Sequence, residues 1–189
     1  MVEFFKKHKT ILLGLLIALL IVLVDQITKI IIANTMSVYE TIEVFPNFMN
    51  FYFTYNTGAA FSWLDDNTLF LALISLTATI GFGYLVLKTC DYDNKLKVLY
   101  SISMAFMLGG TVGNLIDRFM SVFGLREGVI DFFDMWLFGW QFPGVFNVAD
   151  IFLVVGVGLL MFDILFLSDK REKLMNQTLE NEVSDDENN

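Results

Sequence analysis

The sequence predicts an α-helical integral membrane protein with four transmembrane helices and a small outer β-sheet. Two observations carry the prediction of a membrane protein. Of the 189 residues, 56% are hydrophobic and only 17% are charged, whereas a soluble domain of this length needs more polar surface to cover its core. The apolar residues also form long blocks instead of short amphipathic segments, and long apolar blocks are typical of membrane spans.

Each predicted span is an apolar run long enough to cross a hydrocarbon core of about 30 Å, which takes about 20 residues. The first run follows a basic segment, as a signal sequence does, but it is too long and has no cleavage site between small residues. We therefore interpret it as a retained anchor. Glycines at 109, 110 and 113 predict close helix packing in the third span. The spans are predicted at about 11–33, 68–87, 98–116 and 150–167.

The basic residues predict the orientation of these spans. The loop 34–67 contains no Lys or Arg and the loop 117–149 contains two. Short cytoplasmic loops carry an excess of Lys and Arg, so both termini are expected in the cytoplasm and both of these loops outside. The cytoplasmic basic residues would be Lys6, Lys7, Lys9, Lys88, Lys95, Lys97, Lys170, Arg171 and Lys173.

Residues 1–170 are predicted to form one membrane domain, followed by an acidic tail at 171–189. The end of the tail carries several carboxylates and no basic residue, which is typical of a disordered segment.

The two outer loops contain segments rich in β-branched and aromatic residues, at 40–55 and 128–140, and the first includes the dipeptide Pro46-Asn47. Such segments favour strands and such dipeptides favour turns. We predict a small sheet lying at the membrane interface. The alternative is that these are only interfacial aromatic residues, which also suit the headgroup region.

The counts of Cys and His exclude several kinds of chemistry. The chain has one cysteine, Cys90, and one histidine, His8, which lies in the basic stretch KKHK. A disulfide framework, a thiolate metal cluster and a Ser-His-Asp arrangement within the fold are therefore excluded, and we expect no metal and no cofactor. No basic stripe indicates nucleic-acid binding. Carboxylates, amides, hydroxyls and arginines remain as chemical groups.

Several charged residues lie within or beside the predicted spans, where an ionised side chain at mid-bilayer costs about 2.5–3.5 kcal/mol. Asp25 and Lys29 lie four residues apart, so they share a helix face and can form a structural ion pair. Asp117 and Arg118, at the end of the third span, are interpreted in the same way, although the Arg118 fork also suits a peptide carbonyl or a headgroup phosphate. Asp163, near the inner end of the fourth span, is expected to snorkel.

Asp131 and Asp150 lie in the apolar contexts VIDFF and NVADIF, with no Lys or Arg obviously assigned to neutralise them. Two carboxylates brought together in a low-dielectric site share a proton, so that one is a base and the other an acid, as in aspartic proteolysis. A structural or proton-relay role stays open on this pattern alone. Asn56, Asn114 and Asn147 are placed to hold a substrate backbone or to cap helices.

Five blocks of the sequence, in order, resemble lipoprotein signal peptidase (signal peptidase II), a family of bacterial intramembrane aspartic proteases. The blocks are DQITK (25–29), NTGAAF (56–61), GGTVGNLIDR (109–118), VIDF (129–132) and FNVAD (146–150). The resemblance covers nearly the whole predicted membrane domain. It implies four transmembrane helices with a small extracytoplasmic β-cradle and a short outer helix, or interfacial segment.

The resemblance also implies roles for the residues in these blocks. The implied catalytic residues are Asp131 and Asp150. The implied substrate-binding residues are Asn56, Arg118, Asn114 and Asn147, and the implied polar support is formed by Asp25, Lys29 and Asp117.

The implied substrate is a diacylglyceryl-modified prolipoprotein, cleaved at the lipobox on the N-terminal side of the lipidated cysteine. The resemblance further implies a multi-pass protein of the bacterial cytoplasmic (inner) membrane, surrounded by lipid, with the active site at the outer face, and we expect a monomer. Two other classes of function remain as alternatives. A carrier would need carboxylates near the midplane and internal repeats, and a lipoprotein-binding factor would bind substrate without cleaving it.

Overall fold

The computed structural model describes residues 9–58, 67–88, 97–170, 172–173 and 176. His8, Cys90, residues 59–61 of the second block and nearly all of the acidic tail lie outside this set, and the three described tail residues are helical. The elements, in chain order, are α2 (Lys9–Thr35), β1 (Thr41–Phe45), β2 (Met49–Asn56), α3 (Thr68–Lys88), α4 (Lys97–Val122), β3 (Val129–Leu137), β4 (Trp140–Gln141) and α5 (Val148–Phe166).

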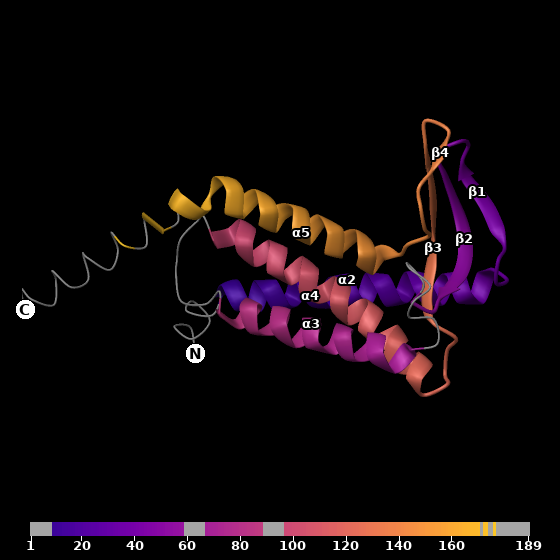
Figure 1. Cartoon of the computed structure of the whole chain (residues 1–189), viewed down its shortest axis with the longest axis horizontal. Helices are drawn as coiled ribbons and strands as arrows, with labels where there is room; N and C mark the ends of the chain where they lie inside the picture. Colours follow the sequence, from indigo (N-terminus) through magenta and orange to yellow (C-terminus); the bar gives the residue numbers. More distant parts are fainter. Residues whose placement is uncertain (1–8, 59–66, 89–96, 171, 174–175, 177–189) are drawn as a thin grey trace, which may run out of the picture.

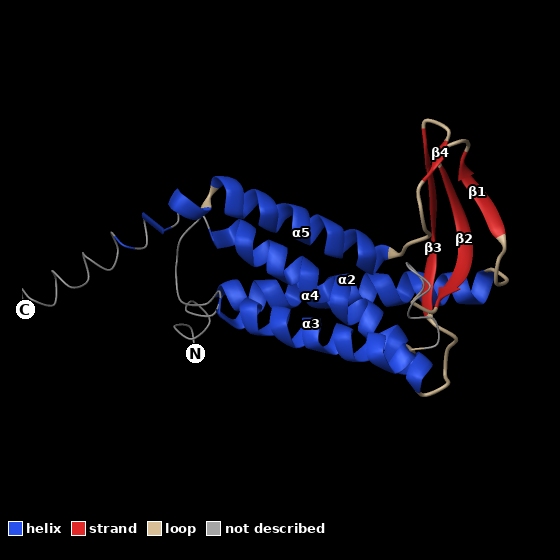
Figure 2. Cartoon of the chain, viewed as in Figure 1, coloured by secondary structure: helices blue, strands red, loops and turns tan. Residues whose placement is uncertain are grey.

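Four helices of the described chain are long and apolar enough to cross a membrane, namely α2, α3, α4 and α5. Three of them begin and end within about two residues of the predicted spans. They lie side by side, with the sheet across one end of the bundle (Figure 1 and Figure 2). The prediction of four helical spans is therefore confirmed.

The third helix, α4, continues well past the predicted end at residue 116, so Asp117 and Arg118 lie inside it. The helix ends at Val122. Gly124, just past this end, has a φ of 70°, and the amide of Leu125 donates to the carbonyl of Met120 at 2.8 Å. This is a Schellman-type ending, which a glycine favours because it adopts positive φ without strain. The prediction was wrong because charged residues interrupt the apolar run without interrupting the helix.

Helix α4 is the central helix, because it packs against α2, α3 and α5. In the most apolar 18-residue stretch of α4, 67% of the residues are buried. The corresponding stretches of α2, α3 and α5 have 22%, 17% and 22% of their residues buried. A Cβ added at Gly110 would lie 2.5 Å from the carbonyl oxygen of Ala149, and one at Gly113 would lie 2.6 Å from Oδ2 of Asp25. The predicted close approach at these glycines is confirmed, and it brings α2 and the start of α5 against one segment of α4.

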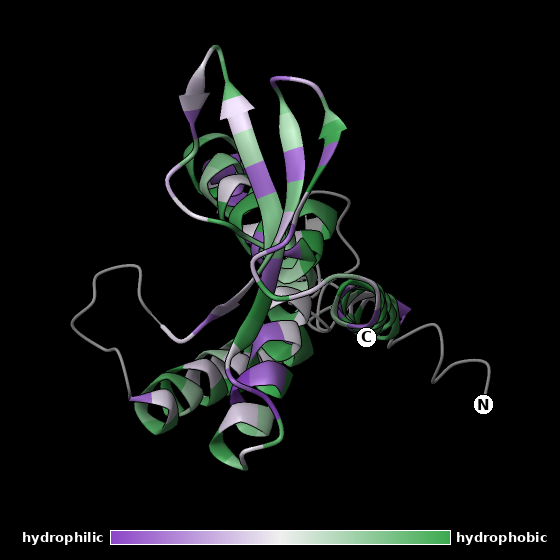
Figure 3. Cartoon of the chain, turned by 90° about the vertical axis from the view of Figure 1, so that its right-hand side faces the viewer, coloured by the Kyte–Doolittle hydropathy of each residue, from purple (hydrophilic) through white to green (hydrophobic). Residues whose placement is uncertain are grey.

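The sheet has four antiparallel strands in the order β1-β2-β3-β4. The predicted turn at Pro46-Asn47 joins β1 to β2, and Asn47 has a φ of 59°. In the end-on view the strands alternate between polar and apolar patches, while the helices are mostly apolar (Figure 3). A small antiparallel sheet is therefore confirmed. The described residues contain no short outer helix, and residues 59–66 lie outside them.

A cluster of buried side chains joins the sheet to the helices. It contains Ile32, Met36, Phe53, Ile130, Phe132 and Val148, which come from the end of α2 and the residue that follows it, from β2 and β3, and from the start of α5. Burial of this apolar surface fixes the strands relative to the helix ends. The cluster therefore positions the polar groups that lie beside it.

Asp163 is fully buried, so the prediction that it snorkels to the membrane surface was wrong. It follows Ala149 and Gly156 at intervals of seven residues, and both of those are buried in the bundle. Residues seven apart lie on nearly the same helix face, so Asp163 shares the face of α5 that packs against the other helices.

Candidate active site

The start of α5 is held by a reciprocal cap between Asn147 and Asp150. The amide of Asp150 donates to Oδ1 of Asn147 at 3.0 Å, and the amide of Asn147 donates to Oδ2 of Asp150 at 3.1 Å. This is a capping box, which satisfies backbone donors of the first helical turn. It fixes the direction of the half-buried Asp150 carboxylate.

Asn147 also contacts the second predicted acid. Its Nδ2 donates to Oδ1 of Asp131 at 2.6 Å, to Oδ1 of Asn114 at 3.0 Å and to the carbonyl of Ile130 at 3.3 Å. One fully buried asparagine therefore bonds both Asp131 and Asp150. The two acids come from β3 and α5, and Asn147 holds these elements in register at this point.

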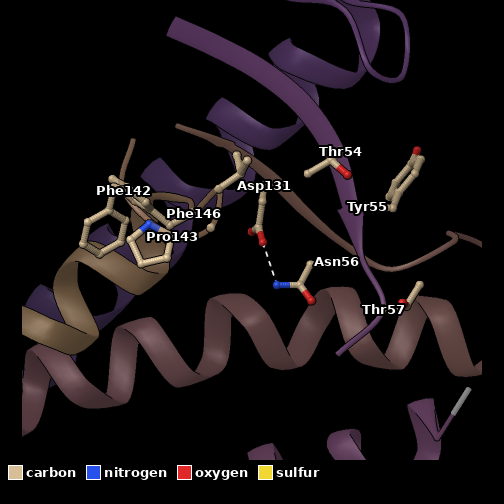
Figure 4. A pocket seen from close by; sticks show the side chains of 10 residues that line it. Thr54, Tyr55, Asn56, Thr57, Asp131, Phe142, Pro143 and Phe146 are labelled. Carbon is tan, nitrogen blue, oxygen red and sulfur yellow. Dashed lines mark hydrogen bonds between the residues drawn. The ribbon is translucent and has the colours of Figure 1, made fainter. Parts of the chain in front are cut away.

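Asp131 is 1% exposed, and its other oxygen is bonded by the neighbouring strand. Nδ2 of Asn56 donates to Oδ2 of Asp131 at 2.8 Å (Figure 4). Asn56 pairs with Val129 across the β2–β3 ladder, and a Cβ at Gly128 would lie 2.7 Å from the Asn56 carbonyl oxygen. Glycine at 128 thus lets β3 enter close enough for the Asn56 amide to reach the acid.

Asp150 is held from the helix side by Asn114 of α4, whose Nδ2 donates to Oδ1 of Asp150 at 2.7 Å. Behind Asn114 lies Lys29, whose Nζ donates to Oδ1 of Asn114 at 3.1 Å. Lys29 also lies 2.8 Å from Asp25 and 2.7 Å from Asp117, and all three side chains are fully buried. The predicted Asp25–Lys29 pair is confirmed as part of this larger network.

Two further contacts tie Asp25 into the network. Oδ1 of Asp25 accepts the backbone amide of Ala149 at 2.9 Å, next to Asp150 in sequence. Gln26 donates to the carbonyl of Gly113 at 3.1 Å. The C-terminal half of α2 is therefore hydrogen-bonded to both α4 and α5.

The predicted pairing of Asp117 with Arg118 was wrong. Asp117 forms ion pairs with Lys29 and with Arg126, whereas Arg118 donates to Oγ of Ser75 on α3. Consecutive residues of a helix point about 100° apart, so these two side chains face different neighbours. The charges of Asp150, Asp131 and Asp117 all act on Arg118.

A cavity of about 420 Å³ lies beside Asp131. Of the predicted site residues, Asn56 and Asp131 line it. Figure 4 shows Asp131 and Asn56 between the loop after β4 and the end of β2. The remaining wall is formed by Thr54, Tyr55, Thr57, Phe142, Pro143, Gly144, Val145 and Phe146. The acid therefore faces a cavity with a largely apolar and aromatic wall.

Burial, and to a smaller extent the charge of Asp150, raise the pKa of Asp131 from 3.8 to about 7. The hydrogen bonds from Asn56 and Asn147 oppose this rise, because they favour the ionised carboxylate. Asp131 therefore holds a proton over a wide range of pH in which an exposed aspartate does not. A carboxyl group in this state can donate a proton near neutrality.

A family model described as signal peptidase (SPase) II matches residues 17–166 of this sequence. The chain belongs to the signal peptidase II family. The lipoprotein signal peptidases of Staphylococcus aureus strains JH9 and Newman are each 36% identical to it over 169 residues. Those residues make up 88% of this chain and 98% of each relative.

Two solved structures, both titled as a bacterial membrane enzyme structure by the in meso method, are similar to this chain. The structure at 2.3 Å resolution has a TM-score of 0.69 and 34% identity, and covers 80% of this chain and 87% of its own. The structure at 1.9 Å has a TM-score of 0.70 and 33% identity, with coverage of 82% and 94%. The protein is a peptidase and a multi-pass bacterial membrane protein.

In this signal peptidase II, the sequence prediction and the structure agree that the named polar residues gather. Asp25, Lys29, Asn114, Asp117, Asn147 and Asp150 form one connected set, which reaches Asp131 and Asn56 through Asn147. The sequence prediction missed three contributors, Gln26, Ser75 and Arg126. Gln26 lies inside a recognised block and could have been found there, whereas no spacing in the sequence points to Ser75 or Arg126.

Proposed function

We propose that this peptidase is an aspartic endopeptidase that removes the signal peptide from diacylglyceryl-modified prolipoproteins. It would cleave at the lipobox, on the N-terminal side of the lipidated cysteine, with water activated by Asp131 and Asp150. The observation that carries this proposal is the position of Asn147, which bonds both acids. Its side chain bonds the carboxyl group of Asp131 and its backbone amide bonds that of Asp150, and two carboxyl groups held by one residue lie in a suitable arrangement to act on one water molecule.

The two acids have different surroundings, which suggests different roles. Asp131 is almost completely buried and its pKa is raised to about 7, so it is the proposed acid. Asp150 is half-buried and receives hydrogen bonds from Asn114 and from the amide of Asn147, so it is the proposed base. This assignment places the shared proton on Asp131 near neutral pH.

The proposed reaction follows the general course of acid–base hydrolysis. Asp150 takes a proton from water as the water oxygen attacks the scissile carbonyl carbon, and Asp131 gives its proton to the carbonyl oxygen. When the tetrahedral intermediate collapses, Asp150 passes its proton to the leaving amine and Asp131 recovers one from the intermediate's hydroxyl. Both acids then regain their starting protonation states.

Among the amides and cations, the geometry suggests a division of roles. Asn56 lines the cavity, and the half-buried Arg118 interacts electrostatically with Asp131 and Asp150. We therefore propose that Asn56 and Arg118 hold the peptide. Asn114 and Asn147 are buried, and each bonds to Asp150. The main role proposed for Asn114 and Asn147 is therefore to orient the acids, and contact with the substrate is a secondary role.

The proposed substrate agrees with the family and with the position of the cavity. The curated relatives are lipoprotein signal peptidases, and the cavity lies where the sheet meets one end of four apolar helices. We propose that this end is the outer face of the cytoplasmic membrane. A substrate anchored there by its own acyl chains would present its scissile bond at the depth of the acids.

The test is a cleavage assay with the purified protein in lipid and a diacylglyceryl-modified prolipoprotein. Asp131→Asn and Asp150→Asn are each expected to lower turnover by at least about 10³-fold, since neither amide can transfer the proton. Asp169→Asn is the matched control, because Asp169 is exposed near the other end of α5. It is expected to cleave at the wild-type rate.

Normal turnover by either dyad variant would contradict the assignment of the acids. Cleavage of an unmodified preprotein at the same rate would contradict the proposed substrate. Transport of a solute without any cleavage would favour the carrier alternative. Thermal unfolding of each variant, measured in the same lipid, separates loss of chemistry from loss of fold.

A further inference from the structure

Arg126 lies in the segment between α4 and β3, outside all five recognised sequence blocks. Its guanidinium forms an ion pair with Oδ1 of Asp117, and its side chain is 13% exposed while that of Asp117 is fully buried. The cavity lining does not include Arg126. A loop residue therefore supplies a charge to the interior of the polar network without facing the cavity.

The ending of α4 explains how a loop residue reaches Asp117. Gly124 turns the chain with a φ of 70° at the end of the helix, and the following bond from Leu125 to Met120 folds it back on the last turn. Arg126 comes directly after this turn. The long side chain can then return along the helix to Asp117, nine residues earlier.

The charges of this cluster balance only when Arg126 is counted. Asp25 and Asp117 carry two negative charges, and Lys29 and Arg126 carry two positive charges. Without Arg126, Lys29 would be the one cation in direct contact with two buried carboxylates among the described residues. Buried carboxylates without enough counter-charge are strongly unfavourable, so Lys29 would be drawn toward them.

A displacement of Lys29 would reach Asp150 through one side chain. Nζ of Lys29 donates to Oδ1 of Asn114, and Nδ2 of the same Asn114 donates to Asp150. The Asn114 amide is thus oriented by a cation on one side and by an acid on the other. If Lys29 moves toward the carboxylates, Asn114 loses the donor that fixes its orientation.

We propose that Arg126 is a positioning residue for Asp150, acting through Asp117, Lys29 and Asn114. This inference rests on the proposed function, because it assumes that Asp150 takes part in the reaction. In this proposal, the segment between α4 and β3 supplies the positive charge that balances Asp117, in the network that orients Asp150. Of the two cations that form ion pairs with Asp25 or Asp117 among the described residues, Lys29 lies in a recognised block and Arg126 does not.

The test measures steady-state cleavage by Arg126→Met, Arg126→Lys and Glu127→Gln. Arg126→Met is expected to lower kcat by about 10- to 100-fold, the range seen when a group that orients an active-site ligand is lost in metal sites. KM is expected to change by less than about twofold. Arg126 does not line the cavity, so its loss should not remove contacts that bind the substrate. Arg126→Lys should recover most of kcat because it restores the charge. Glu127→Gln, at the exposed neighbouring position, should equal the wild type.

A double-mutant cycle tests whether Arg126 acts through Asp117. In the Asp117→Asn background, where the negative charge is gone, Arg126→Met is expected to cause no further loss of kcat. An equal loss in both backgrounds would overturn the proposal. If Arg126→Met does not fold, Arg126→Gln replaces it, and equal kcat values for the Gln and Lys variants would overturn the proposal as well.

The failure of this inference differs from the failure of the proposed function. A wild-type protein that does not cleave the prolipoprotein contradicts the proposed function itself. A wild-type protein that cleaves, together with an Arg126→Met variant of equal kcat, contradicts only the role of Arg126. A rise in KM without a fall in kcat would also count against it, because that result would place Arg126 in substrate binding.

Discussion

The two acids of the site are held by two different kinds of structure. Asp150 lies in the first turn of a helix and is bonded by Asn114, behind which lie two cations and two further carboxylates. Asp131 lies on a strand, and the side chains that bond it are two neutral amides, Asn56 and Asn147. The helix side of the site is therefore rich in charge, and the sheet side is held by neutral donors.

This difference in surroundings is the basis for the different roles proposed for the two aspartates. Neutral amides around a buried carboxylate compensate only part of its desolvation, and the pKa of Asp131 stays raised to about 7. The half-buried Asp150 is instead connected through Asn114 to the cation Lys29. The proposed acid and base thus follow from which element carries each aspartate.

The largest expected effect on this comparison comes from removing the cation of the helix side. Lys29→Met leaves Asp25 and Asp117 buried without their shared partner. Loss of one partner of a buried ion pair typically costs about 3–5 kcal/mol, so the unfolding temperature should fall markedly and cleavage should be lost. Thermal unfolding in lipid, together with the cleavage assay, measures both effects.

Lys170→Met is the matched control for this substitution, because Lys170 is exposed and lies beyond the end of α5. It should leave both the unfolding temperature and the cleavage rate unchanged. A Lys29→Met protein as stable as the wild type would show that the helix-side charges do not depend on Lys29. The contrast between the two sides of the site would then lose its physical basis.

The second prediction concerns pH and the sheet side. Because the pKa of Asp131 is about 7 in the folded protein and 3.8 as the ordinary value, the folded state binds the proton more tightly. The contribution of this proton to the free energy of unfolding is fully present below about pH 4 and is lost as the pH rises through about 7. Cleavage should fall over the same rise, since the proposed acid loses its proton. Unfolding temperatures and kcat measured from pH 5.5 to 8.5 test both trends.

Asp131→Asn separates this effect from other titrations. The variant cannot lose a proton at residue 131, so its unfolding temperature should fall less between pH 5.5 and pH 8.5 than that of the wild type. Each kcal/mol of difference in the free energy of unfolding corresponds to about 2–4 °C in unfolding temperature for a protein of this size. Parallel curves for the two proteins would mean that Asp131 does not titrate in this range.

The sequence predicted the four helices and the small sheet because both depend on local patterns. A long apolar run specifies a span, and the β-branched and aromatic segment before Asn56 specifies a strand. The predicted site residues other than Arg118 form one hydrogen-bonded set, whereas Arg118 donates to Ser75. The Asp25–Lys29 pair needed only the spacing of four residues on a helix.

The contacts that the sequence did not predict depend on how the chain turns and packs in space. The ion pair of Asp117 with Arg126 requires the glycine ending of α4, which hydropathy does not reveal. The burial of Asp163 follows from which face of α5 meets the bundle. Hydropathy locates the helices along the chain but does not tell which polar side chain faces which neighbour.

The smallest expected effect concerns Asp134, a second carboxylate of β3 held by neutral donors. Asp134 is 7% exposed and accepts bonds from Asn50 at 3.3 Å, Trp136 at 3.2 Å and Gln141 at 2.9 Å. These donors lie on β2, β3 and β4. Asp134 therefore ties three strands together directly before the segment 142–146, which forms part of the cavity wall.

Asp134→Ala removes the common acceptor and leaves the three donors to water or to weaker partners. The expected loss of stability is about 1–2 kcal/mol, as for a partly accessible hydrogen-bonded group. Because residues 142–146 line the cavity and Asp134 does not, KM should rise severalfold while kcat stays near the wild-type value. Glu43→Ala, on the exposed edge strand β1, is the control and should change neither constant. A fall in kcat at unchanged KM would mean that the sheet side, like the helix side, acts on the acids themselves, and the two sides would then differ in charge but not in task.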